Sequence, residues 1–399
     1  MAHQGDQKKE WIVCFKECFN DRKCKYKFHQ SIKVKSRYDS ICYGMCCVAT
    51  LEDLEKNLDY KNVVKFYAPD DVVSTAVTKE KRVLTPEALG ALKAQPLGGF
   101  IQRIGADKSS QLSGNGTGSL ESRTDINVFV VDTGIYPHPD LNVVGGRNFT
   151  SANANAWKDD NGHGTHVAGI IGSRDNAYGI VGVAPGVRLW AIKVLGSNGN
   201  GNISYIISAF NWILQTRGTV WKGHGVVNLS FGGRMNQALD EAVMTLVRKG
   251  LVVSVAAGNS SVNASTFSPA RVPDVITVGA TSPNPSYNAM ASYSNFGSGV
   301  DILSPGSNIY STYLSGYASL SGTSMAAPVV TGTIALILNR HPVPISLTSS
   351  IIKYIRDILV TDSSNTKPKY YDQSIGTNAR IQIPSNKPTT SISVWAGGY

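Results

Sequence analysis

The sequence predicts an α/β protein: a doubly wound parallel sheet preceded by a smaller α+β unit. Its 399 residues are enough for two domains. From about residue 100 onward, short and nearly continuous apolar runs alternate with longer segments in which apolar residues recur every three or four positions. Runs of the first kind suit parallel strands covered on both faces, and their alternation with helices is typical of a doubly wound sheet.

The elements of the larger part follow one another along the chain. The apolar runs predict strands at 128–131, 187–194, 226–230, 251–257, 275–278 and 301–303. The helical spacing predicts helices at 203–214, 237–249, 325–338 and 347–359. Ligands of such sheets bind outside the carboxyl ends of the strands. Asp132, Ser230 and Asn259 each lie at such an end, so we expect a site there.

The first part of the chain predicts a small α+β unit. Strands are expected at 11–15, 41–49 and 63–67, with a capped helix at 50–58 before the last of them. Pro69 follows the last strand and stops it. Residues 75–99 then read as a connector, with a charged run and a final Gly-Gly pair.

Composition excludes several classes of protein. A hydrophobic content of 42% with 17% charged residues fits a globular chain. The net charge of +10 is spread along the sequence without an aromatic-interleaved basic motif, so we expect no nucleic-acid partner. No run of 18 apolar residues predicts a membrane span. The first ten residues have no apolar core of a signal peptide, so the signal was removed, the start is misplaced, or the protein stays inside the cell.

The cysteines cluster in the first 47 residues. They are Cys14, Cys18, Cys24, Cys42, Cys46 and Cys47. An even number in a short segment predicts a disulfide framework, for which 15 pairings exist. A zinc site lacks a CxxC pair, and free thiols in a reducing compartment are the remaining alternative.

Three glycine-bearing motifs carry the functional signal. Asp132 follows the apolar run Phe-Val-Val, His163 lies in Asn-Gly-His-Gly-Thr-His, and Ser324 lies in Ser-Gly-Thr-Ser-Met-Ala-Ala-Pro. Their separations are 163 − 132 = 31 and 324 − 163 = 161 residues. Aspartate, histidine and serine in this order form one of the known arrangements of a catalytic triad. The motifs therefore predict nucleophilic catalysis by serine.

Each triad residue has an expected role. Ser324, at the start of a predicted helix, is the nucleophile, and free backbone N–H groups there suit an oxyanion. His163 is the general base, and Asp132 holds its tautomer. Asn259 is expected to complete the oxyanion hole. His166 is expected to be structural, since the spacing and glutamate of a zinc-protease helix are missing and no metal site is predicted.

These motifs resemble those of the subtilisin-like serine protease family, peptidase family S8, and within it the proteinase K branch. The resemblance implies a subtilisin-like fold with two substrate-binding walls and one pairing strand. One wall is formed by Ser230, Phe231 and Gly232, and the other by Ala256, Ala257 and Gly258. The pairing strand contains Gly199, Asn200 and Gly201. It also implies that apolar or aromatic residues are accepted before the cleaved bond. Phe231 stands where the family more often has leucine. The larger side chain predicts a smaller pocket for the fourth substrate residue before the cleaved bond, the P4 residue.

The resemblance extends to the N-terminal unit, which is similar to the ferredoxin-like inhibitory propeptides of inhibitor type I9. It implies a propeptide-like domain at 1–78, a linker and processing region at 79–99, and a peptidase domain at 100–399. Several family members bind structural calcium, but Thr281 stands near the place of an expected aspartate, so calcium is unsupported and no cofactor is required. N-glycosylation sequons begin at Asn115, Asn148, Asn202 and Asn263.

The sequence as a whole predicts a secreted, monomeric endopeptidase of broad specificity, made as an autoinhibited precursor. Its expected partners are protein and peptide substrates and its own propeptide. A catalytically silent binding protein with the same fold is the alternative from another class. The alternative to a secreted enzyme is an intracellular processing peptidase.

Overall fold

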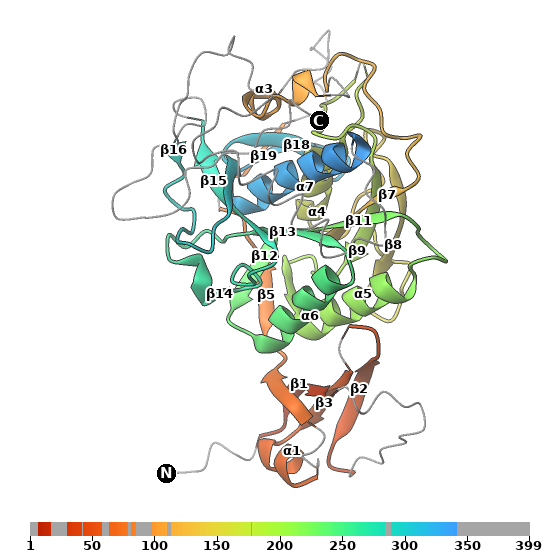
Figure 1. Ribbon diagram of the computed structural model, residues 1–399, viewed down its shortest axis with the longest axis vertical. Helices are drawn as coiled ribbons and strands as arrows, with labels where there is room; N and C mark the ends of the chain where they lie inside the picture. Colours follow the sequence, from red (N-terminus) through yellow and green to blue (C-terminus); the bar gives the residue numbers. More distant parts are fainter. Residues whose placement is uncertain are drawn as a thin grey trace.

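The computed structural model describes residues 7–16, 30–41, 43–57, 64–78, 81–84, 98–109, 113–176, 178–283 and 289–340. Figure 1 shows a small N-terminal unit beneath a larger one, and a single strand, β5, that runs from the first into the second. The predicted helix at 347–359 and three of the six cysteines lie outside the described residues.

The N-terminal unit is a four-stranded antiparallel sheet in the order β2-β3-β1-β4. Its elements are β1 (Lys9–Phe15), β2 (Lys33–Tyr38), β3 (Gly44–Ala49), α1 (Leu51–Asn57) and β4 (Val64–Pro69). Strand order and the helix between β3 and β4 agree with the expected ferredoxin-like fold. The sequence had not predicted β2 as a separate strand.

Alternation along these strands gives the sheet two apolar faces. Val13, Met45 and Leu54 belong to the core that the sheet shares with α1. Ile12 and Phe66 point the other way and join the core of the larger unit. No disulfide joins two of the described cysteines, all of which are buried, so this part of the chain gives no support to the expected framework.

The larger unit is built on an eight-stranded sheet. Its main path runs β16-β15-β13-β11-β7-β9-β8, and β17 also pairs with β15. The parallel strands are β7 (Ile126–Asp132), β8 (Val143–Asn148), β9 (Arg188–Lys193), β11 (His224–Leu229), β13 (Val252–Ala256), β15 (Ile276–Ser282) and β17 (Ile302–Pro305). The antiparallel edge is β16 (Ala289–Met290). The doubly wound parallel sheet predicted from the apolar runs is confirmed.

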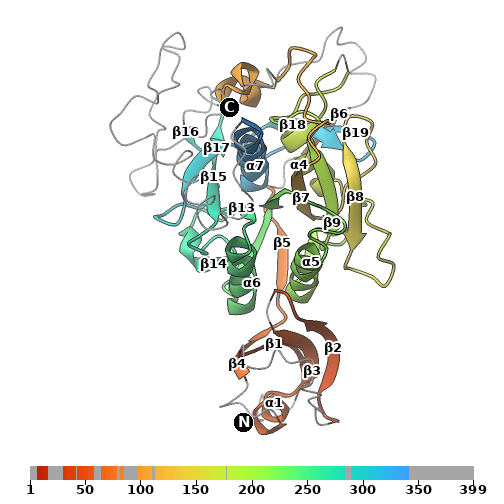
Figure 2. The ribbon, with the colours of Figure 1, turned by 45° about the vertical axis from the view of Figure 1, so that its right-hand side comes forward.

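Helices cover both faces of this sheet. On one face lie α4 (His163–Gly172) and α7 (Thr323–Arg340), which pack on each other and on the central strands. On the other lie α5 (Ile203–Gln215) and α6 (Gln237–Arg248), which Figures 1 and 2 both place between the sheet and the N-terminal unit. Three shorter helical segments are α3 (Gly99–Arg103), η2 (Ala106–Lys108) and η3 (Ala264–Thr266).

Two small sheets join parts of the chain that are far apart in sequence. In one, β5 (Val72–Thr75) lies between β10 (Asn200–Asn202) and β12 (Phe231–Arg234), and β12 also pairs with β14 (Phe267–Ser268). In the other, the hairpin of β18 (Ile309–Tyr313) and β19 (Gly316–Leu320) is extended by β6 (Lys81–Leu84). Part of the predicted linker is therefore a strand paired with the larger unit.

No helix among the described residues is both long and apolar enough to cross a membrane.

Candidate active site

Asp132 and His163 form a buried pair where β7 ends and α4 begins. His163 Nδ1 lies 2.7 Å from Asp132 Oδ1, and the backbone N–H of Thr133 donates to the same oxygen at 2.7 Å. Gly164 makes this approach feasible, because a Cβ there would lie 2.1 Å from the carbonyl oxygen of Gly134. The two residues that the sequence placed together are thus in contact.

The start of α4 is fixed by side-chain caps. Asp159 accepts N–H bonds from Asn161 and Gly162 through one oxygen, and binds the N–H and hydroxyl of Thr165 through the other. The side-chain oxygen of Asn161 accepts the N–H of His163 at 3.1 Å. These caps satisfy N–H groups that the first helical turn leaves without partners, and they hold the imidazole at a defined point.

Ser324 is the second residue of α7, and its hydroxyl donates to the carbonyl oxygen of Ser230 at 2.7 Å. Pro328 lies four residues further on and has no N–H to give to the carbonyl of Ser324. The hydroxyl of Ser230 fills that place at 2.9 Å. Nε2 of His163 is buried and has no hydrogen-bond partner among the described residues, so the histidine and the Ser324 hydroxyl are not hydrogen-bonded here.

Asn259 is held by one end of its amide. Its side-chain oxygen accepts both the N–H and the hydroxyl of Thr323, each at 2.9 Å. Its Nδ2 is buried and lacks a partner within the described part of the chain. Asn259 therefore carries a buried, unpaired donor and is held against the residue that precedes Ser324.

The chain's own segment 72–78 crosses this site. β5 pairs with β10 at Gly201↔Val73 and with β12 at Gly232↔Ser74. The sequence had predicted that these two regions would bind an extended peptide.

Beyond β5 the same segment continues past Ser324. The N–H of Thr75 donates to Gly199 O (3.1 Å), that of Ala76 to Ser230 O (3.2 Å), and that of Thr78 to Ser321 O (2.8 Å). The N–H of Ser324 donates to the carbonyl oxygen of Ala76 at 3.2 Å. The peptide bond after Ala76 therefore lies at Ser324.

Of the two predicted walls, the one at Ser230, Phe231 and Gly232 contacts this segment through its backbone. The side chain of Ser230 is buried against α7, so its contribution to the cleft is its carbonyl oxygen. Phe231 is fully buried in the core, and Ala256 and Ala257 are buried at the end of β13. Gly258, with φ of 102°, donates its N–H to the hydroxyl of Thr323 at 3.0 Å.

His166 has the structural environment expected for it. Its Nε2 lies 3.1 Å from Ile309 O and 3.0 Å from Ala318 O, in the hairpin that covers α4. Burial lowers the pKa of His166 to about 3, so the ring is neutral at pH 7.

One group of described side chains has donor atoms close enough to hold a metal ion: Glu10, Cys46 and Asp70, within 4.8 Å of one another. It lies in the N-terminal unit. Glu10 already pairs with Lys35, and Asp70 binds the start of α5.

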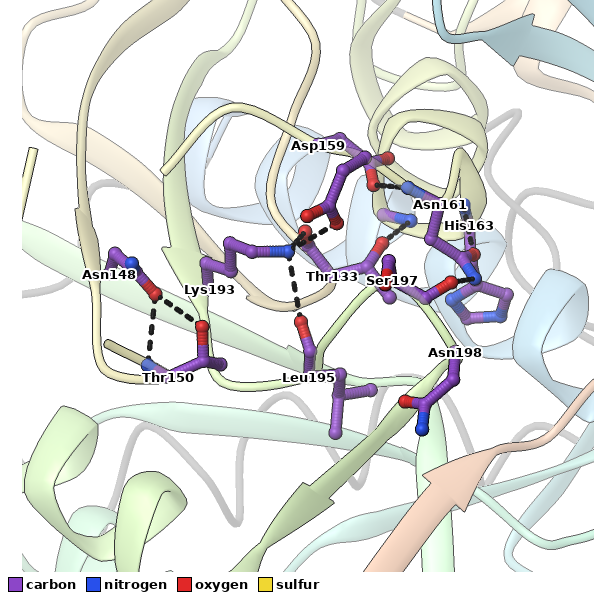
Figure 3. Close-up of polar contacts among 12 residues, drawn as sticks. Thr133, Asn148, Thr150, Asp159, Asn161, His163, Lys193, Leu195, Ser197 and Asn198 are labelled. Carbon is purple, nitrogen blue, oxygen red and sulfur yellow. Dashed lines mark hydrogen bonds and ion pairs between the residues drawn. The ribbon is translucent and has the colours of Figure 1, made fainter. Parts of the chain in front are cut away.

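The sequence did not identify three polar residues behind the triad. Figure 3 shows all three: Lys193, which points at the carbonyl oxygens of Thr133 and Leu195; Asn161, which reaches from the His163 loop to Ser197; and Asp159, which accepts the N–H groups of that loop. The sequence signal that could have identified Lys193 is its charge at the end of an otherwise apolar strand.

This fold and this site define a serine protease of the subtilisin-like class. A family model described as the subtilase family matches residues 123–377, and the chain belongs to that family. It is 39% identical over 277 residues to an alkaline protease of Alkalihalobacillus alcalophilus, covering 69% of this chain and 68% of the relative. It is 44% identical over 219 residues to subtilisin Savinase of Lederbergia lenta, covering 54% of this chain and 77% of that protein.

A solved structure, a cold-adapted subtilisin-like serine proteinase, superposes with a TM-score of 0.58 at 33% identity, covering 73% of this chain and 97% of the other.

Proposed function

We propose that the protein is a serine endopeptidase that uses Asp132, His163 and Ser324 on extended peptides and is made as an autoinhibited precursor. The observation that carries the proposal is the hydrogen bond from Ser324 N to the carbonyl oxygen of Ala76, with β5 paired on both sides. A peptide bound in this way presents its carbonyl carbon to the serine.

The reaction follows from the geometry. The hydroxyl of Ser324 turns from Ser230 O toward Nε2 of His163, which takes its proton as Oγ attacks the carbonyl carbon. The oxyanion accepts hydrogen bonds from Ser324 N and Asn259 Nδ2. His163 then gives the proton to the leaving amine, and Asp132 stabilises the imidazolium. Water repeats the sequence on the acyl-enzyme and releases the second product.

The same geometry supports a maturation step. Residues 1–76 form the inhibitory part, and the scissile bond is Ala76–Val77, two residues before the boundary at 78 that the sequence suggested. The ferredoxin-like strand order supports the I9-type assignment. Since β6 pairs with β19, the start of the mature chain stays attached to the larger unit after the cut.

Specificity is expected to be broad, because the segment is bound mainly through backbone hydrogen bonds. If Ala76 is the first residue before the cleaved bond, Val73 is the fourth. Its side chain is 1% exposed, which marks a second apolar subsite at this fourth position. We further propose, on the motifs quoted above, a secreted monomer of the proteinase K-like branch.

The test is covalent labelling and hydrolysis. A fluorophosphonate should modify Ser324 of the mature enzyme, and the enzyme should hydrolyse casein. Ser324→Ala should fold normally and lower kcat by about 10⁶-fold. A Ser324→Ala protein with wild-type activity would exclude this triad. A folded wild type that neither labels nor cleaves would favour the silent binding protein.

A further inference from the structure

Lys193 is a buried ammonium directly beside the Asp132–His163 pair. It closes β9, is the Cα partner of Asp132 on the neighbouring strand, and is 4% exposed. Its Nζ donates to Thr133 O at 2.6 Å, to Asp160 Oδ1 at 2.7 Å and to Leu195 O at 3.0 Å. A buried charge is tolerated only when it is paired and hydrogen-bonded, and here each of the three N–H bonds has its own acceptor.

The first carbonyl belongs to the residue that orients the catalytic aspartate. Thr133 donates its N–H to Asp132 Oδ1 at 2.7 Å, and its hydroxyl accepts the N–H of Gly164, next to His163, at 2.9 Å. Lys193 therefore holds the third polar group of Thr133. The carbonyl belongs to the next peptide, Thr133–Gly134, so Lys193 fixes the turn that directly follows the N–H donor to Asp132.

The second carbonyl opens the loop that leads to the substrate-pairing strand. Leu195 donates its own N–H to the carbonyl oxygen of Asp132 at 3.1 Å. The loop that follows is closed by a bond from Gly196 N to Asn200 O at 2.8 Å, and Gly199 O accepts the N–H of Thr75. The Lys193 side chain thus links the end of the aspartate strand to the loop that leads to Asn200–Asn202 (Figure 3).

A second link runs from the histidine to the same loop. Asn161 accepts the N–H of His163 through its side-chain oxygen and donates its Nδ2 to Ser197 O at 2.8 Å. Figure 3 shows Asn161 and Lys193 on either side of Thr133, with Ser197 and Leu195 in the same loop.

We propose that Lys193 is a positioning residue that, together with Asn161, couples the strand Asn200–Asn202 to the Asp132–His163 pair. The proposal rests on the catalytic roles proposed above. A substrate long enough to pair with that strand then meets a triad whose distance to the strand is fixed. Without Lys193, two carbonyls lose their donor, and the strand is held to the triad only by the Leu195 N–H on Asp132 O and by the Asn161 link.

The test uses the mature enzyme, well below its thermal midpoint, with two chromogenic peptides. The long one fills four positions before the cleaved bond, and the short one fills only the first. Lys193→Met should lower kcat on both by about 10²-fold, as small misplacements of catalytic groups do. It should also shrink the ratio of kcat/KM for the long over the short peptide. Loss of stability alone would leave that ratio unchanged.

Asp160→Asn is the matched control. It weakens the ion pair but keeps both carbonyl bonds, and because the Asp160 side chain is 55% exposed, we expect kcat and the ratio to stay within about twofold of wild type. If Lys193→Met does not fold, Asn161→Ser tests the same coupling. Serine caps His163 as asparagine does but does not reach Ser197. The ratio should again fall.

A folded Lys193→Met enzyme with wild-type kcat and ratio would overturn the proposal, as would an equal loss in Asp160→Asn. Fluorophosphonate labelling of wild type separates this result from failure of the proposed triad, because an enzyme that labels and cleaves keeps the triad whatever Lys193 does.

Discussion

The backbone N–H of Ser324 donates a 3.2 Å hydrogen bond to the carbonyl oxygen of Ala76 in the same chain. One residue thus supplies both the expected nucleophile and a donor to the carbonyl that it would attack. Gly322 permits the contact, since a Cβ there would lie 2.4 Å from Ala76 O. A covalent tether gives such an occupant a high effective concentration, so the uncut chain should block its own site.

The first prediction concerns the bond that is cut. Wild-type protein should yield fragments ending at Ala76 and beginning at Val77, measured by N-terminal sequencing and intact mass. Ser324→Ala should stay whole. Ala76→Pro removes the N–H that Ser230 O accepts at 3.2 Å, and should accumulate uncut precursor.

The control for this cut is an outside protease. The basic residues at 79–82 offer such an enzyme a site, and it would cleave Ser324→Ala as readily as wild type. A mature chain that starts beyond Val77, with Ser324→Ala also cleaved, would contradict self-processing.

The second prediction concerns Asn259. Asn259→Asp keeps an oxygen for the N–H of Thr323 but has no donor for an oxyanion. We expect kcat to fall by about 10²–10³-fold with KM little changed, because the lost bond forms in the transition state. Asn259→Leu should show the same loss with an added drop in stability. An increase in KM at constant kcat would instead make Asn259 a binding residue.

Sequence patterns were sufficient for the sheet and for the contact between Asp132 and His163, because both have local signatures. The apolar runs of the parallel strands reflect burial on both faces. Asp132, His163 and Ser324 stand in short motifs whose glycines are required by close packing, as Gly164 is against Gly134.

The elements that were missed are set by tertiary contacts. Glycines 164, 169 and 172 disfavour a helix locally, yet α4 forms because the helix is buried throughout and capped by Asp159. β8 contains Gly145, where a Cβ would lie 2.6 Å from the ring of Trp190.

The links to the triad have the same origin. Lys193 and β5 contact residues that are far away in sequence, and a local sequence pattern does not predict such long-range contacts.

The third prediction concerns acid stability. Burial holds the pKa of His166 near 3, against about 6.5 in an unfolded chain. The unfolded state therefore binds one more proton between these values, and the free energy of unfolding should fall as pH drops below 6.5, by at most about 1.4 kcal/mol per pH unit.

The measurement for His166 is urea unfolding of Ser324→Ala protein at pH 7 and pH 4.5. His166→Gln keeps an N–H donor for Ile309 O and Ala318 O but does not titrate, so its loss of stability with pH should be smaller. Equal pH dependence in both proteins would show that His166 is not the group responsible.

The last prediction concerns how the N-terminal unit holds the enzyme. Asp70 accepts the N–H of Ser204 at 2.8 Å and its hydroxyl at 2.6 Å, and so caps α5 from the other unit. The fragment 1–76 should inhibit the mature enzyme when added separately. In Asp70→Ala, the lost cap should weaken binding by about 1 kcal/mol, or about fivefold in Ki.

Lys65→Ala is the matched control for Asp70→Ala, because it removes an ion pair between the same two units. Lys65 lies 2.9 Å from Glu241, but half of its side chain is exposed, at 50%. Exposed pairs of this kind contribute about 0–1 kcal/mol, so Ki should change less than in Asp70→Ala. If the two variants weaken inhibition equally, general charge attraction rather than the helix cap holds the N-terminal unit in place. If the wild-type fragment does not inhibit at micromolar concentration, the propeptide assignment is wrong while the protease assignment stands.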